Sequence, residues 1–171
     1  MLASYLTRLG TTWVHCLGAG RVDPLDEVRL PMRVWPNDLD TNLHVNNGRY
    51  LTMMDFGRFA YVMRTGLMGT LVRNRWSPIL GAATVQFRRE LRPFQRFDLV
   101  TRVVAWDQKW FYIEQRFEVG GEVHARAQVR GVIKHGRRTI PPGDMMRAAG
   151  HDGPSPALPA SFASWIGSQP A

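Results

Sequence analysis

Apolar and polar residues alternate in several segments of the chain, and this alternation is typical of β-strands with one buried face. In residues 27–35, EVRLPMRVW, every second position from Val28 to Val34 is apolar. The pattern recurs around residues 83–88 and 97–105, and in the two segments KWFYIEQRFEV and EVHARAQVRGVIK on either side of Gly120-Gly121. The Gly-Gly pair predicts a hairpin turn. We therefore expect one antiparallel sheet of five strands.

A helical pattern separates the first of these strands from the other four. Residues 47–65 read as a helix, with Asn46 or Asn47 as its N-cap and Gly66 placed to end it. Polar positions recur every three residues and therefore drift around a helix of 3.6 residues per turn. We expect a largely enclosed helix with the sheet curled around it, and an ion pair between Asp55 and Arg58.

The first segment of the chain also has helical spacing. Its apolar positions are Leu2, Tyr5, Leu6, Leu9, Trp13 and Leu17. Arg8 interrupts what would be the apolar region of a signal peptide, and no stretch approaches the length of a bilayer span. We expect an amphipathic helix that packs on its own domain or on a partner subunit, in preference to peripheral contact with a membrane.

These patterns predict three parts in an α+β chain of 171 residues. Residues 1–24 form the N-terminal amphipathic segment, and residues 25–137 form a single domain with an antiparallel sheet around one long central helix. Residues 138–171 form an extension rich in Pro, Gly and Ala, with a short helix at SFASWIG. A loop is expected near residues 73–76, between the central helix and the second strand.

The charge of the chain indicates an anionic partner. Twenty-two basic and fourteen acidic residues give a formal charge of +8, which attracts polyanions. Nucleic acid, an acidic membrane face and a phosphate-bearing metabolite all fit. The arginines are spread along the chain without a zinc-finger or RNA-binding signature, so we expect no nucleic-acid partner.

Several chemistries find no support in the residues. Cys16 is the only cysteine, which excludes an internal disulfide and makes the cytoplasm the default location. The five histidines show no paired ligand spacing, so no metal is expected. There is no Gly-x-Ser-x-Gly elbow, phosphate-binding glycine loop or dinucleotide fingerprint, and no cofactor is implied.

The stretch DLDTNLHVNN, residues 38–47, carries the candidate chemistry. In an extended loop, Asp40, Asn42 and His44 would line one wall, because residues two apart project to the same side. The free N–H groups at the start of the helix, near Asn47 and Gly48, could bind an oxyanion. A carboxylate beside such a site suits hydrolysis of an activated acyl group, and a thioester is the natural substrate because thiolate leaves readily.

A purely structural interpretation of the same stretch remains open. Asn-rich loops before helices are common caps, and Asp38 or Asp40 could simply accept backbone N–H groups. A single histidine is more often a packing or surface residue than a catalytic one.

The segment DLDTNLHVNNGRYL resembles the Asp-x-Asn-x-His-Val-Asn-Asn-x-x-Tyr segment of plant acyl-carrier-protein thioesterases. More broadly, it resembles the opening of bacterial hotdog-fold acyl-CoA thioesterases of the 4-hydroxybenzoyl-CoA type. The resemblance implies a hotdog fold over roughly residues 25 to 135. It also implies catalytic or substrate-positioning roles for Asp40, Asn42 and His44.

A second similarity lies in VQFRRELRPF, which resembles a Tyr-Arg-Arg-Glu stretch of the plant enzymes. It implies that Glu90 acts as a base, whereas the structural alternative is a salt bridge to Arg88, Arg89 or Arg92. The plant cysteine that follows the glutamate is Leu91 here. The plant enzymes have two hotdog units, so one unit implies a homodimer, or a homotetramer, with sites at the subunit boundary.

Together these features predict a thioesterase of fatty-acid metabolism that hydrolyses acyl-CoA or acyl-carrier-protein thioesters without metal. Asp40 would be the base or nucleophile. Phosphates of coenzyme A or the acidic carrier protein would meet basic side chains such as Arg88, Arg126 and Arg130, although each could be a solvated strand residue. Two alternatives stay open: a non-catalytic acyl-binding hotdog protein, and a hotdog dehydratase or hydratase.

Overall fold

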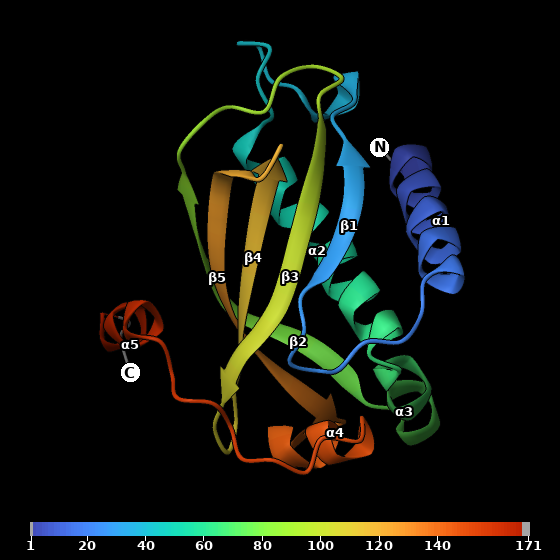
Figure 1. Cartoon of the computed structure of the whole chain (residues 1–171), viewed down its shortest axis with the longest axis vertical. Coiled ribbons are helices and arrows are strands. Elements are labelled where there is room, and N and C mark those ends of the chain that lie inside the picture. Colours follow the sequence, from blue (N-terminus) through green and yellow to red (C-terminus); the bar gives the residue numbers. More distant parts are fainter. Residues whose placement is uncertain (1, 169–171) are drawn as a thin grey trace.

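The computed structural model describes residues 2–168, with side chains from residue 4 onward, and contains one curled antiparallel sheet (Figure 1). The strand order is β1-β3-β4-β5-β2, and β6 pairs with β5. The strands are β1 Val28–Arg33, β2 Ser77–Phe87, β3 Arg96–Trp106, β4 Phe111–Val119, β5 Glu122–His135 and β6 Arg138–Ile140. The expected sheet is confirmed, and β6 extends it beyond the five predicted strands.

The central helix α2, Asn47–Arg64, lies in the concave side of the sheet (Figure 1). Its N-cap is Asn46, whose side chain accepts the Gly48 N–H at 2.9 Å, and Gly66 follows its end with a φ of +77°. Both predicted helix signals are confirmed. The helix is largely enclosed, and its buried residues are Tyr50, Met53, Met54, Phe56, Gly57, Ala60 and Tyr61.

A glycine and a buried glutamine hold α2 close to the sheet. A Cβ atom at Gly57 would lie 2.7 Å from both Gln115 Nε2 and Thr101 Oγ1, so only glycine allows this approach. Gln115 Nε2 donates to the Met54 carbonyl oxygen at 3.0 Å and to Thr101 Oγ1 at 2.9 Å. Its Oε1 accepts a hydrogen bond from Arg58 at 2.8 Å. Arg58 also forms the predicted ion pair with Asp55.

Two short helices were not expected from the sequence. The predicted loop near residues 73–76 is wrong in part, because α3, Leu67–Asn74, occupies most of this connection. Its turns bury Leu67 and Leu71 against the core, and eight residues offer too short a periodic pattern to be distinctive. The second helix is α4, Pro142–Ala148, which buries Met145 and Met146.

The C-terminal extension wraps onto the outer face of the sheet. The predicted helix at its end is confirmed as α5, Ala160–Gly167. Phe162 of α5 is buried and packs with Val104, Ala105 and Tyr112, whose side chains point away from α2. The division at residues 24 and 137 stays a prediction.

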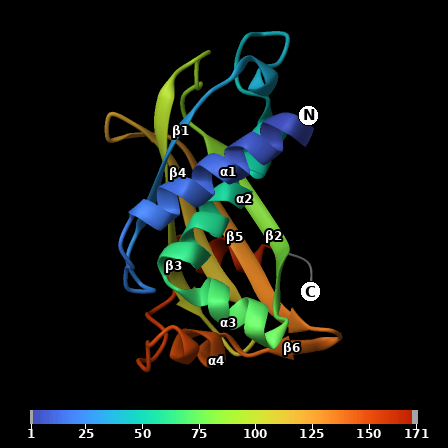
Figure 2. The ribbon, with the colours of Figure 1, turned by 90° about the vertical axis from the view of Figure 1, so that its right-hand side faces the viewer.

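The N-terminal helix α1, Leu2–Gly18, crosses α2 and lies beside β1 (Figure 2). It packs on its own domain, as expected, with Arg8, Thr12 and Cys16 buried. Leu9 packs against the core, and the rings of Tyr5 and Trp13 lie 4.9 and 5.9 Å from those of Phe56 and Phe59. Leu6, Val14 and Leu17 are exposed instead, so only part of the apolar side faces the domain. Between Leu2 and Ser168, no helix is both long enough and apolar enough to cross a bilayer.

Candidate active site

The loop before α2 is a tight turn and not the extended wall expected from the sequence. A β-bridge between Leu39 and Val45 closes it. The Asp40 N–H donates to the His44 carbonyl oxygen at 2.9 Å, and Leu43 has a φ of +59°. The side chains of Asn42 and His44 are exposed at the turn, while Asp40 is half-buried at its base.

Asp40 both shapes this turn and keeps a free oxygen. Its Oδ1 accepts the backbone N–H groups of Asn42 at 2.8 Å and His44 at 3.4 Å, so the structural interpretation is confirmed for this atom. Within residues 4–168, no hydrogen bond or ion pair engages its other oxygen, Oδ2. The same carboxylate can therefore hold the turn and present an oxygen to a ligand.

Asp38 is a second carboxylate, of whose role the sequence indicated only the part of accepting a backbone N–H group. It is fully buried, and its oxygens accept hydrogen bonds from Arg8, from Arg49 at 3.0 and 3.1 Å, and from the Trp35 N–H at 2.8 Å. Burial lowers the pKa of Arg8, and attraction to Asp38 opposes that shift. Asp38 thus ties α1 and the first turn of α2 to the loop. No local pattern signals this role, because Arg8 lies thirty positions earlier in the chain.

The start of α2 supplies the candidate oxyanion site that the sequence indicated. Asn47 and Gly48 are both exposed, as an accessible site requires. However, the Gly48 N–H already donates to the Asn46 cap. The Asn47 N–H occupies the first helical position, where the helix provides no backbone acceptor, and it lies at the positive end of the helix dipole. Asn47 is therefore the better candidate donor of the two.

The segment that carries Glu90 lies directly beside the loop that carries Asp40. The Val45 N–H donates to the Leu91 carbonyl oxygen at 3.4 Å, and His124 Nδ1 lies 2.9 Å from the Glu90 carbonyl oxygen. The structure therefore brings the Asp40 loop and the Glu90 segment together. The Glu90 carboxylate is exposed and lies 3.4 Å from Arg92, in the ion pair that the structural alternative predicted.

The three candidate phosphate-binding arginines are not gathered at this site. Ala125 and Val129 of β5 face α2, so Arg126 and Arg130, which alternate with them, lie on the outer face of the sheet. Arg130 lies over the Trp110 ring, 4.8 Å from its centroid. Arg88 is exposed just after β2. The sequence could place Arg126 and Arg130 on one face but could not tell that it is the face away from the loop.

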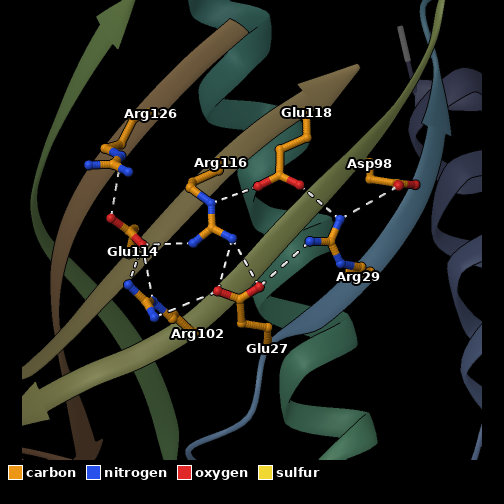
Figure 3. A network of polar contacts seen from close by, with 8 residues as sticks. All are labelled: Glu27, Arg29, Asp98, Arg102, Glu114, Arg116, Glu118 and Arg126. Atoms are coloured by element: carbon orange, nitrogen blue, oxygen red, sulfur yellow. Dashed lines mark hydrogen bonds and ion pairs between the residues drawn. The ribbon is translucent and has the colours of Figure 1, made fainter. Parts of the chain in front are cut away.

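Most arginines of this outer face are already paired (Figure 3). Arg116 donates to Glu27 and Glu114 at 2.9 Å and to Glu118 at 2.7 Å. Burial acts to lower the pKa of Arg116, but these three carboxylates outweigh it and raise the pKa above its ordinary value. The network consists of Glu27, Arg29, Asp98, Arg102, Glu114, Arg116, Glu118 and Arg126. Four arginines and four carboxylates balance, so this surface offers little net charge to a phosphate.

An apolar cavity of about 590 Å³ lies between α2, α3 and the sheet. Its rim carries the Asp55–Arg58 ion pair, while its wall includes Phe59, Val62, Leu71, Phe111 and Val129. Asp55 lies eight positions after Asn47, about 12 Å along the helix axis. A second cavity of about 540 Å³ lies between α1 and β1. Asp40, Asn42 and His44 line neither of these two cavities.

The described part of the chain contains no cluster of three His, Cys, Asp or Glu side chains placed to hold a metal ion. The chemistry available at the loop is thus that of a carboxylate, an amide, an imidazole and a helix N-terminus. These groups can orient water, accept a proton and stabilise a developing negative charge.

Comparison with known proteins identifies the family. The thioesterase-like superfamily matches residues 34–166. Protein THEM6 of Xenopus laevis is 44% identical over 84 residues, which cover 49% of this chain and 41% of the frog protein. A probable thioesterase of Saccharomyces cerevisiae, YBR096W, is 29% identical over 119 residues, which cover 67% of this chain and 51% of the yeast protein. The chain thus spans about half the length of these relatives.

Comparison with solved structures supports the same fold. A 1,4-dihydroxy-2-naphthoyl-CoA thioesterase from Synechocystis superposes with a TM-score of 0.62 at 15% identity, covering 72% of this chain and 95% of that protein. At this identity the similarity shows the hotdog fold alone. The sheet, its central helix and the family match over most of the chain lead to one conclusion: this protein belongs to the thioesterase-like superfamily.

Proposed function

We propose that this chain hydrolyses acyl thioesters of coenzyme A or acyl carrier protein, with Asp40 as the base or nucleophile. The position of Asp40 carries the proposal. Its Oδ1 is committed to the turn, its Oδ2 has no protein partner among the described residues, and the turn leads directly into the N-terminus of α2. Family membership supports the same class of reaction.

In the water-activating form of this mechanism, Asp40 Oδ2 accepts a proton as the water oxygen attacks the thioester carbonyl carbon. The carbonyl electron pair moves to oxygen, and the Asn47 N–H with the positive end of α2 stabilises that oxyanion. The tetrahedral intermediate then collapses, the carbon–sulfur bond breaks, and the leaving thiolate takes up the proton held by Asp40, which restores the carboxylate. The exposed side chains of Asn42 and His44 would position the water or the substrate.

The apolar cavity is the proposed site for the acyl group. An acyl chain with its carbonyl at the start of α2 would run along the helix and reach the cavity rim after about 12 Å. Apolar walls such as Phe59, Leu71 and Phe111 suit an aliphatic or aromatic tail. We propose no single acyl length from this cavity.

The active assembly would be at least a homodimer, formed along β2. This strand ends the sheet, and it exposes Ile79 and Leu80 to 46% and 48%. A long apolar edge strand is a template for pairing with another chain. Light scattering should give at least twice the chain mass of 19.5 kDa, and Leu80→Lys should give a lower mass than the parent. A single-chain mass for the parent would contradict this assembly.

Thiol release tests the proposed reaction. Purified protein is incubated with a panel of acyl-CoA and acyl-carrier-protein substrates, and free thiol is measured with a chromogenic disulfide. Release that depends on the acyl group supports the proposal. Binding without turnover across the panel would favour a non-catalytic acyl-binding protein, and loss or addition of water without free thiol would favour a dehydratase or hydratase.

A further inference from the structure

One side of α1 is apolar and largely exposed. Leu6, Trp13, Val14 and Leu17, here called the α1 stripe, are exposed to 55%, 45%, 70% and 68%. Their spacing of three, four and seven places them along a single side of the helix. The side that packs on the domain instead carries Arg8, Thr12 and Cys16, all less than a tenth exposed.

The α1 stripe is not a set of scattered surface residues. Single exposed apolar side chains are ordinary, whereas a contiguous apolar patch marks an interaction surface. The buried ion pair of Arg8 with Asp38 fixes which side of α1 faces the domain. Rotating the helix to bury the stripe would break that ion pair. The stripe therefore remains available to an outside partner.

A second copy joined at β2 would not cover this surface. β1 and β2 are at opposite ends of the strand order, and α1 crosses α2 on the open side of the curled sheet, where Arg8 donates to the Arg33 carbonyl oxygen of β1 (Figures 1 and 2). The stripe is also too small for a stable protein–protein interface, which takes about 20 residues or more from each partner. An apolar stripe along one side of a helix is instead the kind of surface that lies in the interfacial region of a bilayer.

The charge around α1 indicates the kind of bilayer. The helix contains no Asp or Glu, and the chain as a whole carries a formal charge of +8. Arg33 and Arg96 are exposed and line the cavity beside α1 together with His15. Asp98 and Glu118 line it too, but both are paired with Arg29. Trp13 is the residue type that favours the boundary between headgroups and acyl chains.

We propose that the α1 stripe lies in the interfacial region of an anionic lipid bilayer and docks the protein there as a peripheral membrane protein. From the spacing alone, contact with the protein's own domain or a partner subunit was preferred to contact with a membrane, and the proposal departs from that preference. The Trp13 ring lies 5.9 Å from that of Phe59, which lines the apolar cavity. Docking would therefore hold this cavity near the membrane. The inference does not depend on thioester hydrolysis.

Vesicle co-sedimentation of the full chain tests the inference. The probes are vesicles of equimolar phosphatidylglycerol and phosphatidylcholine, compared with vesicles of phosphatidylcholine alone. The test variant is Val14→Gln with Leu17→Gln, which keeps good helix formers at exposed positions. The control is Leu51→Gln with Leu158→Gln, two changes of an exposed aliphatic residue to glutamine outside both the stripe and the apolar cavity.

We expect the parent and the control to sediment with the anionic vesicles and much less with the neutral ones. The test variant should partition at least about tenfold more weakly, since it no longer buries two aliphatic side chains in lipid. A parent that stays in the supernatant with both vesicles would overturn the proposal, as would equal binding by parent and test variant. A halved mass of the test variant in light scattering would also overturn it, because a second copy would then cover the stripe.

Discussion

The carboxylate of Asp40 accepts the backbone N–H of Asn42 at 2.8 Å through Oδ1, so one candidate catalytic residue determines where the next one is held. A residue with this double role can be tested only by a substitution that keeps one function and removes the other. Asparagine meets this requirement, because its side-chain oxygen can accept the same N–H groups while it carries no charge.

Asp40→Asn should therefore abolish most thioester hydrolysis and leave the fold and assembly intact. We expect kcat/KM to fall by at least about 100-fold, the usual contribution of a positioned general base. Thiol release measures the activity, and the thermal midpoint with light scattering measures the fold and assembly. Equal rates for the variant and the parent would refute the assignment of Asp40.

Asp38→Asn should instead destabilise the fold, although the same change is made only two positions away. Removing the Asp38 charge leaves Arg8 and Arg49 without the carboxylate that both contact. Loss of one partner of a buried ion pair costs about 3 kcal/mol or more in the free energy of unfolding. Urea unfolding measures this loss, and Asp40→Asn is its matched control. Equal unfolding midpoints for the two variants would contradict the structural role of Asp38.

Gly57→Ala should destabilise the protein, since its Cβ would lie 2.7 Å from Gln115 and Thr101 and 2.8 Å from a Leu99 methyl carbon. Overpacking of this kind costs about 1–3 kcal/mol. Gly10→Ala in α1 is the control, because its Cβ would meet no atom within 4 Å. Replacing that helical glycine should stabilise the protein by about 0.5–1 kcal/mol. Chemical denaturation compares the two, and a tolerated alanine at position 57 would show that α2 can move away from the sheet.

The charge network of the outer face predicts a loss of stability in acid (Figure 3). Burial acts to raise the pKa of Glu118, but hydrogen bonds and attraction from Arg116 and Arg29 outweigh it and hold the pKa below its ordinary value of 4.5. A carboxylate with a lowered pKa in the folded state stabilises the protein fully above its unfolded pKa. This stabilisation is lost as the pH falls below about 4.5 and through the folded pKa.

Urea midpoints between about pH 7 and about pH 3 measure this effect. Glu118→Gln should reduce the difference between the two ends of the range, because glutamine does not titrate. Glu122→Gln is the control, since the ion pair of Glu122 with Arg89 is exposed and contributes little. The same acid dependence in Glu118→Gln and the parent would rule out Glu118 as a source of that dependence.

Local patterns in the sequence determined most of the fold. Alternation with period two identified β1, β3 to β5 and the second half of β2, because one face of each strand is buried against α2. Asn46 and Gly66 marked the ends of α2, since capping depends on residues within one turn. The short helices α3 and α4 were missed because their burial depends on distant contacts more than on their own pattern.

The residues of the candidate site were identified from the sequence, but their arrangement was not. The motif placed Asp40, Asn42 and His44 before the central helix, while only the folded chain set Glu90 beside them and carried Arg126 and Arg130 to the opposite face. Strand alternation tells which residues share a face, but the curl of the sheet decides which face encloses α2.

The N-terminal helix shows most clearly what the local sequence determines and what only the tertiary contacts decide. Its spacing determined that residues 2–18 would be helical and amphipathic, because backbone hydrogen bonding and side-chain periodicity act over a few residues. Only the tertiary structure decided which side of that helix faces inward. The choice depends on the buried pairing of Arg8 with Asp38, two charges far apart in sequence, whose meeting leaves Leu6, Val14 and Leu17 facing outward.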